Sequence, residues 1–152
     1  MFREHQRSVF AYFLRVAGDR DKAEELTQET FYRACTAALR YRGDAPAANW
    51  LFGIARRVLL EASRKGLFDR FDDITDDEPA APEQDIAQRM DLETAFANLA
   101  LIDREVLMLV DYLGFSPSEA ADLMAVEAPA FRMRLFRARR HLRDLLRVEE
   151  TP

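Results

Sequence analysis

The sequence contains a single cysteine, Cys35, and only two histidines. One cysteine cannot form an internal disulfide, and so few soft ligands leave no structural zinc site. Glycine and proline number only 5 and 6 among 152 residues, which excludes fibrous and low-complexity architectures. No apolar run reaches the roughly 20 residues of a membrane span, and the N-terminus is charged from Arg3, unlike a signal peptide. We therefore expect a soluble cytoplasmic protein with no membrane insertion, no metal and no other cofactor.

Apolar and charged residues are both plentiful, at 49% and 32%, so the chain has the composition of a folded globular protein. Its length suits one ordinary domain or two small ones. The net charge of −5 is unevenly distributed: residues 1–66 carry +4, residues 67–93 carry −8 and residues 94–152 carry −1. Because nucleic-acid binding depends on local patches, the overall charge does not exclude it.

Hydrophobic periodicity predicts helices in the first 66 residues. Apolar residues recur at helical spacing from Val9 to Ala17. Asp21, followed three residues later by Glu24, resembles a capping box and predicts the start of a second helix there. A third helix carries Trp50 on its apolar face, where core packing is favoured over base stacking.

An acidic segment with two prolines follows, and we interpret residues 67–90 as a linker. Helical patterning resumes beyond it, and no stretch shows strand alternation. The predicted fold class is therefore all-α, with two small helical domains at residues 1–66 and 91–152. Since the linker has too few apolar residues to join their cores, we expect each domain to fold separately.

A helix-turn-helix is indicated near the C-terminus. Ser116, Pro117 and Glu119 form a strong helix start, because a capping serine, a proline at the first helical position and a glutamate at the third complete a capping box. A short break precedes a last helix with Phe131 and Leu135 on its core side. That helix is rich in arginine: Arg132, Arg134, Arg137, Arg139 and Arg140. Guanidinium groups suit phosphates and guanine edges in the major groove, but the same pattern also fits a solvated face.

No arrangement of residues indicates catalysis. His5 and His141 are far apart in the sequence and are expected to be solvated or to cap helices. Cys35 is expected to be a small buried hydrophobe. No Ser/His/Asp arrangement, nucleophile elbow or phosphate-binding glycine loop is present. We therefore expect a protein that is not an enzyme.

Several motifs together resemble one known family. The run GDRDKAEELTQETFYRA, followed by YRGDAPAANWLFGIARRVLLEASRK, is similar to the promoter-melting domain of extracytoplasmic-function (ECF) RNA polymerase sigma factors. After the linker, DREVLMLVDYLGFSPSEAADLM and RLFRARRHLRDLL are similar to the second DNA-binding domain of that family. The resemblance covers nearly the whole chain in the family's order and spacing.

The resemblance implies an alternative sigma factor, which recruits core RNA polymerase to a restricted set of promoters and opens them. It implies polymerase binding by Glu24, Glu25, Leu26, Gln28 and Glu29, although carboxylates also favour helix N-termini for their own stability. It implies contact with promoter DNA by Tyr41, Arg42, Asn49, Arg56 and Arg57, in addition to the arginines of the last helix. An anti-sigma factor is a further partner that it implies.

The chain departs from the family pattern at the start of the last helix. Where the family commonly has a glycine turn followed by small and hydroxyl residues, this sequence has Ala125 to Met133, including Glu127 and Pro129. This leaves few donors for reading bases, while the arginines keep phosphate binding plausible. Two alternatives therefore stay open: a sigma-like decoy with weakened promoter recognition, and a free-standing repressor.

Overall fold

The structure, a computed structural model, describes residues 2–68 and 91–146. Over these residues the chain forms only helices and their connections, and the all-α prediction is confirmed. The expected acidic linker lies outside the described residues from residue 69 onward. The elements are α1 (Phe2–Ala17), α2 (Arg20–Ala37), the 3-10 turn η1 (Ala38–Arg40), α3 (Ala47–Arg64), α4 (Leu92–Ala97), α5 (Leu101–Leu107), the π-helical turn η2 (Met108–Tyr112), α6 (Pro117–Met124) and α7 (Ala128–Leu146).

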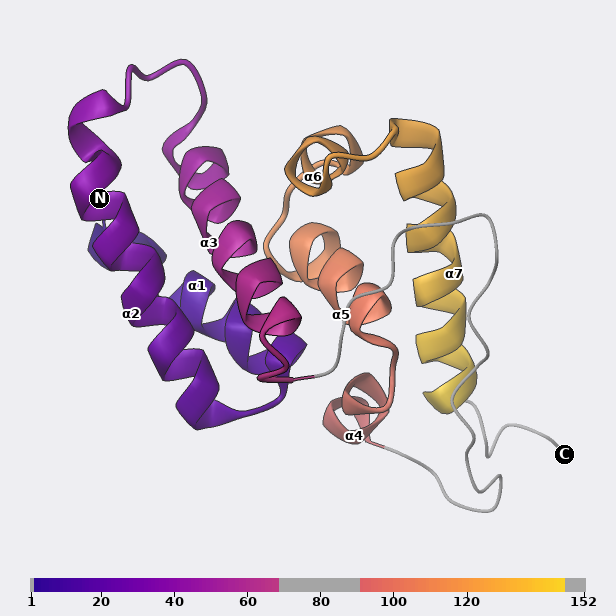
Figure 1. The fold of residues 1–152 in the computed structure, drawn as a ribbon. Coiled ribbons are helices and arrows are strands. Elements are labelled where there is room, and N and C mark those ends of the chain that lie inside the picture. The colour runs from indigo at the N-terminus through magenta and orange to yellow at the C-terminus, as the bar shows by residue number, and fades with distance from the viewer. Residues whose placement is uncertain (1, 69–90, 147–152) are drawn as a thin grey trace, which may run out of the picture.

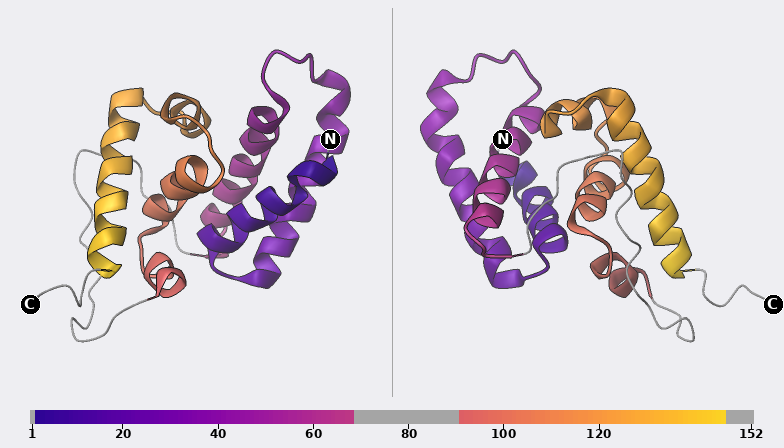
Figure 2. Two further views of the ribbon diagram at one scale, coloured as in Figure 1. Left: turned by 180° about the vertical axis from the view of Figure 1, so that it is seen from behind. Right: turned by 45° about the vertical axis from the view of Figure 1, so that its right-hand side comes forward.

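The helices form two bundles that lie side by side (Figures 1 and 2). The first bundle consists of α1, α2 and α3, and the second of α4 to α7. α5 lies between α3 and α7, so it faces both bundles (Figure 1). This central position decides where the charged side chains of α5 must find partners.

α1 and α2 are joined by a short turn at Gly18 and Asp19. Gly18 adopts a φ of +76°, a left-handed conformation that glycine tolerates best, and it ends α1. Asp19 is therefore the first residue free to cap α2, and its side chain accepts a hydrogen bond from the Lys22 backbone N–H at 3.0 Å. The predicted capping box at Asp21 and Glu24 is wrong, because the true cap lies two residues earlier.

The helix-turn-helix of the second bundle forms where the sequence predicts it. Ser116 accepts from the Glu119 backbone at 3.0 Å, and the Glu119 carboxylate accepts from the Ser116 backbone at 2.9 Å. This confirms the capping box, with Pro117 at the first turn. α6 ends at Met124, and the capping residue Ala125 adopts the left-handed conformation with φ 56° and ψ 43°. The expected helix that follows begins at Ala128.

α5 is buried over its whole length, so its charged residues need partners inside the protein. Asp103 is 1% exposed and binds two side chains of α7. Arg134 donates through Nε to Oδ1 at 3.0 Å, and His141 Nδ1 lies 2.9 Å from Oδ2. The expectation of a solvated or capping His141 is wrong, since this side chain is buried. The interpretation of Arg134 as a DNA contact is also wrong, since Asp103 holds its guanidinium inside the bundle.

The two bundles share one continuous core. Phe52 of α3 and Phe115, just before α6, meet edge to face with their ring centroids 5.4 Å apart. Glu105 of α5 is fully buried beside Tyr12 and Arg56 of the first bundle. The sequence predicts separate cores because the linker has few apolar residues. In the structure the two bundles instead contact each other directly, without the linker. Separate folding of residues 1–66 and 91–152 stays a prediction.

The strained turn at Ala125 yields a stability prediction. A non-glycine residue in the left-handed region costs roughly 1 kcal/mol or more, so Ala125→Gly should raise the free energy of unfolding by about 0.5–1 kcal/mol. Ala130→Gly, inside α7, is the matched control and should lower it by a similar amount. Urea unfolding of both variants, followed by circular dichroism, tests the difference in sign. Two losses of equal size would show that the turn at Ala125 is not strained.

The buried Asp103 yields a second stability prediction. Asp103→Ala leaves the charge of Arg134 buried and unpaired, so the free energy of unfolding should fall by about 3–5 kcal/mol. Asp111→Ala is the control, because it also removes an arginine partner but from an exposed pair with Arg139. The control should cost about 1 kcal/mol or less. Similar losses in the two variants, measured by urea unfolding, would contradict a structural role for the Asp103 network.

Candidate functional site

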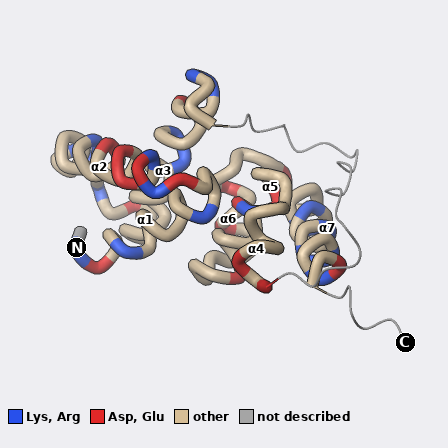
Figure 3. Tube along the Cα trace, turned by 90° about the horizontal axis from the view of Figure 1, so that it is seen from below, with Lys and Arg blue, Asp and Glu red and all other residues tan. Residues whose placement is uncertain are grey.

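The outer face of α2 presents a row of polar side chains. Glu24, Glu25, Gln28 and Glu29 are exposed, whereas Leu26 is only 7% exposed and points toward α3. Figure 3 shows the run of acidic residues along α2. Of the five residues that the resemblance assigns to polymerase binding, the structure thus places four on one surface and Leu26 beneath it.

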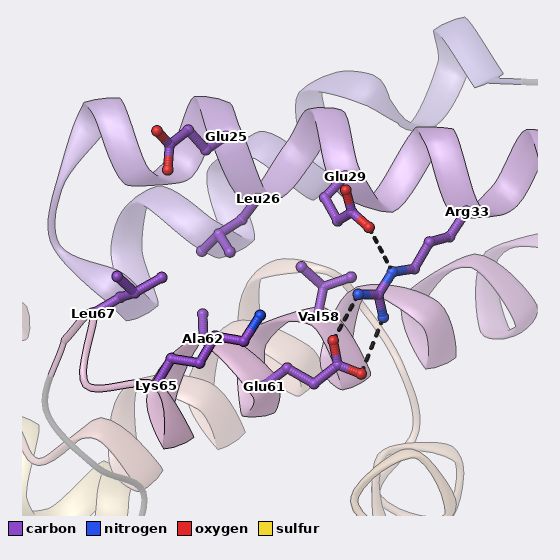
Figure 4. A pocket seen from close by; sticks show the side chains of 9 residues that line it. All are labelled: Glu25, Leu26, Glu29, Arg33, Val58, Glu61, Ala62, Lys65 and Leu67. Carbon is purple, nitrogen blue, oxygen red and sulfur yellow. Dashed lines mark hydrogen bonds and ion pairs between the residues drawn. The ribbon is translucent and has the colours of Figure 1, made fainter.

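A groove of about 320 Å³ runs between α2 and α3 below this row (Figure 4). Leu26, Val58 and Leu67 give it apolar surface, and charged side chains stand on both rims. Its lining residues are Glu25, Leu26, Glu29, Arg33, Val58, Glu61, Ala62, Lys65 and Leu67. This shape suits a partner that presents apolar and basic side chains together.

Arg33 connects the two rims of the groove (Figure 4). Its Nε lies 2.8 Å from Glu29 on α2, and its other nitrogens meet both oxygens of Glu61 on α3 at 2.6 and 3.2 Å. These hydrogen bonds raise the pKa of Arg33 and lower the pKa of Glu61. Sequence reasoning missed Arg33 and Glu61. The spacing of four residues between Glu29 and Arg33 indicates an ion pair along one helix, but it does not indicate the second partner, Glu61 on α3.

Cys35 is exposed, so the expectation of a buried cysteine is wrong. The buried stripe of α2 passes through Thr30 and Ala34. Cys35 is about 100° around the helix from Ala34, on the outward side with Gln28 and the 67% exposed Tyr32. Its apolar neighbours in sequence therefore misled the prediction, because helical angle decides burial and adjacency does not.

The connection between α2 and α3 presents an aromatic pair. The rings of Tyr41 and Trp50 lie 4.8 Å apart at an interplanar angle of 30°. Trp50 is half-buried and packs against the core, as expected for its helical spacing. Tyr41 also donates its hydroxyl hydrogen bond to the Ala45 carbonyl, while Arg42 beside it is exposed.

The polar face of α3 turns toward α6 in the second bundle. Asn49 donates from Nδ2 to Glu119 at 3.0 Å, and hydrogen bonds from Ser116 and Asn49 lower the pKa of Glu119. Arg56 is mostly covered and donates to Glu105 at 3.1 and 3.3 Å, whereas Arg57 is exposed. A pocket of about 470 Å³ between these helices is lined by Ala45, Asn49, Gly53, Arg56, Arg57, Leu60, Glu119, Asp122, Leu123 and Ala125.

The α7 arginines differ in their surroundings. Arg132 is exposed, while Arg137 and Arg140 are half-buried, with the Arg140 guanidinium 5.9 Å from the centre of the Phe136 ring. Arg139 is exposed and paired with Asp111 through two hydrogen bonds of 3.0 and 2.6 Å. With Arg134 enclosed in the core, the outer face of α7 keeps four of the five predicted arginines.

Other kinds of site find no support in the described part of the chain. There, no three His, Cys, Asp or Glu side chains gather in a way that could bind a metal ion. None of the helices described is both long and apolar enough to span a membrane.

Comparison with known proteins places both bundles in one family. Residues 1–66 match the Sigma-70 region 2 family, and residues 89–142 match Sigma-70, region 4. The ECF RNA polymerase sigma factor SigL of Mycobacterium tuberculosis is 30% identical over 94% of this chain and 85% of its own length. SigE of Mycolicibacterium smegmatis is 30% identical over 96% of this chain, which spans only 60% of that relative.

A solved structure extends the similarity to the arrangement of the helices. It is the sigma factor RpoE in complex with the anti-sigma factor NepR, from Bartonella quintana. The sigma factor is 25% identical and superposes with a TM-score of 0.76 over 97% of this chain and 95% of its own. With two sigma-70 regions in the right order and relatives along nearly its whole length, the chain belongs to the ECF family of RNA polymerase sigma factors.

Proposed function

We propose that the outer face of α2 is the docking surface for core RNA polymerase, and that cations of α3 and α7 contact promoter DNA. The family gives the general role, an alternative sigma factor that directs transcription initiation. The proposal adds which residues perform it. The observation that supports it most is the exposed row Glu24, Glu25, Gln28 and Glu29 above the groove between α2 and α3.

The docking surface has a defined chemistry. Arg33 holds the Glu29 carboxylate in place, so part of the side-chain entropy that binding would cost is already lost in the free protein. The adjoining groove offers apolar surface from Leu26 and Val58. A helical polymerase element with basic residues beside an apolar ridge fits both features.

The DNA-contacting residues fall into two sets. Tyr41, Arg42 and Arg57 lie at or near the connection into α3 and are suited to a melted strand, because single strands bind to cations and aromatic rings. On α7, Arg132 is exposed near the helix start, where a helix-turn-helix approaches the duplex. Asn49 and Arg56 belong with the first set but are bound to carboxylates of the second bundle here.

Three accompanying inferences concern the cellular role. Sigma factors are non-enzymatic initiation factors, and we infer that this chain has no catalytic activity of its own. Since its proposed partner is core RNA polymerase, we infer a cytoplasmic location. An anti-sigma factor is a proposed further partner, because the similar RpoE was solved in complex with one. The decoy alternative is not favoured, since the relatives that match are sigma factors, and a repressor would leave the α2 surface without a role.

The docking proposal is tested by reversing charge on α2. Glu25→Arg combined with Gln28→Ala should weaken binding to core polymerase at least tenfold, while the free energy of unfolding changes by about 0.5 kcal/mol or less because both residues are exposed. The matched control is Glu4→Arg with Gln6→Ala, the same chemical changes on exposed positions of α1. Fluorescence anisotropy with purified core enzyme measures both. Equal affinity of the two variants would contradict docking through α2.

The DNA proposal is tested on α7 by salt dependence. Each arginine–phosphate contact releases counterions, so Arg132→Ala should lower the slope of log affinity against log salt by about 0.9 for duplex DNA. The loss should be similar for all sequences, because contact with phosphate does not depend on the base. Arg139→Ala is the control and should change the slope less, since Asp111 already neutralises this arginine. A loss confined to one base pair would instead indicate direct base reading by Arg132.

A further inference from the structure

The exposed face of α7 carries two large apolar side chains that lie outside the core. Met133 is 52% exposed and Phe136 is 58% exposed. Because an α-helix turns by about 100° per residue, both lie about 140–160° around α7 from the fully buried Ala138. Three residues apart in the sequence, they are neighbours on one helix face. Met133 and Phe136 therefore form an apolar ridge on the side of α7 that faces away from its own bundle.

The apolar ridge lies on the second helix of the helix-turn-helix. α7 forms the outer edge of the second bundle (Figures 1 and 2). In a helix-turn-helix the second helix enters the major groove, and residues of its first half contact the base edges. Both ridge residues belong to the first half of α7. A single exposed apolar residue needs no explanation, whereas two on the face that would enter the groove point to a contact with bases.

Arginines flank the apolar ridge on both sides. Arg132 and Arg137 lie about 70° to either side of it around the helix axis. A helix with its side chains is about 10–12 Å across and the major groove is about 12 Å wide. The central ridge of an inserted helix then meets the base edges, while the flanking positions face the phosphates of the two strands. Cations at the walls and apolar groups at the floor complement the groove in charge.

Arg140 holds the ring of Phe136 in place. Its guanidinium lies 5.9 Å from the centre of that ring, within the range of a cation–π contact. The contact comes from the next turn of the same helix, so it is present whether or not DNA is bound. Restraint of the ring in the free protein reduces the side-chain entropy that binding would cost.

The chemistry of the apolar ridge selects one kind of base. Phenylalanine has no hydrogen-bonding group in its side chain, and methionine has only a weak acceptor. Among the four bases, only thymine presents an apolar group in the major groove, its C5-methyl. Against an apolar side chain, the donors and acceptors of the other base edges would lose water without gaining a partner. Apolar contact with the methyl group of thymine is therefore the favoured readout.

We propose that Met133 and Phe136 are specificity-determining residues that read neighbouring thymines through their C5-methyl groups, while the arginines beside them contact phosphates. The inference rests on the proposed function, because it requires α7 to contact duplex DNA. It adds a preference among base pairs, which contact between arginine and phosphate does not provide. This readout needs no hydrogen-bond donor, so it suits a helix that begins with Glu127 and Pro129.

The test compares thymine with uracil, which differs only in lacking the C5-methyl group. Duplexes that bind the full chain are selected from a random-sequence pool and remade with deoxyuridine in place of each thymine in turn. We expect the selected duplexes to share neighbouring thymines. Replacement at a contacted position should weaken binding about fourfold, the value of one buried methyl group. Both bases pair with adenine and present the same O4 acceptor, so the difference reports the methyl group alone.

Two variants assign the methyl contact to the apolar ridge. Met133→Ala combined with Phe136→Ala should bind the thymine and uracil duplexes with nearly equal affinity. Its slope of log affinity against log salt should stay unchanged, because the arginines are retained. The matched control is Leu39→Ala with Leu92→Ala, which truncates two exposed apolar side chains outside α7 and should keep the thymine preference. Circular dichroism confirms folding, and Met133→Ala alone carries the test if the double variant is unfolded.

The outcomes separate this inference from the proposed function. Equal binding of thymine and uracil duplexes by the unaltered chain, with a salt slope that falls in Arg132→Ala, would overturn methyl reading and support the phosphate contact. A thymine preference that survives in the double variant would overturn the assignment to Met133 and Phe136. No duplex binding at low salt would overturn both proposals for α7. Weaker capture of the double variant by core polymerase, with its thymine preference unchanged, would place the ridge in a protein interface and overturn its role in DNA reading.

Discussion

The burial of α5 on all sides is the constraint on which the rest of the structure depends. A helix buried all round has no solvated face for charged residues, yet α5 contains Asp103 and Glu105. Two residues along a helix correspond to a rotation of about 200°, so these carboxylates point in nearly opposite directions. Asp103 is paired with α7 in its own bundle, and Glu105 with α1 and α3 in the other.

This division gives the two carboxylates different consequences. The Asp103 pairs hold α7 against α5, which fixes the orientation of the helix that is proposed to contact DNA. The Glu105 pairs hold one bundle against the other, inside the core that the two bundles share. One short helix therefore carries both a contact within its own bundle and a contact to the other bundle, and the difference lies in which bundle supplies the partner.

Local signals in the sequence predicted much of the fold. The Ser116 capping box, the break before α7 and the all-α class all follow from spacing and composition within a few residues. The cap of α2 was misplaced because Asp19 and Asp21 both carry a capping side chain, and only the left-handed Gly18 decides between them. Which of the two residues caps α2 depends on where α1 ends, and the capping pattern of α2 alone carries no information about the end of α1.

Stricter use of the helical period would have found Arg134 and His141. Phe131 and Leu135 define the core side of α7, and Arg134, at three residues from Phe131, lies on it. His141 follows at ten residues, on the same stripe. A charged residue at a core position requires a buried partner, so the pattern signals a network. The helical pattern does not identify Asp103 as the partner, because Asp103 lies 31 residues from Arg134 and tertiary packing brings the two together.

The α2 surface shows the same limit on sequence reasoning. Its exposed acids could be listed from the sequence, since helix angle and polarity determine exposure. The groove beneath them could not, because it exists only where α3 brings Glu61 and Val58 opposite α2. Arg33 then links the two helices, so the chemistry of the surface depends on a contact between residues 28 positions apart.

Two of the α7 arginines are already bound to carboxylates, which limits the groups that the second bundle can offer to DNA. Arg134 is enclosed with Asp103, and Arg139 is neutralised by Asp111. Near the start of the helix, Arg132 stands close to Glu127 and Pro129, neither of which can donate a side-chain hydrogen bond to a base edge. The proposed DNA contact of α7 therefore rests on its remaining arginines, and a contact between arginine and phosphate does not depend on the DNA sequence.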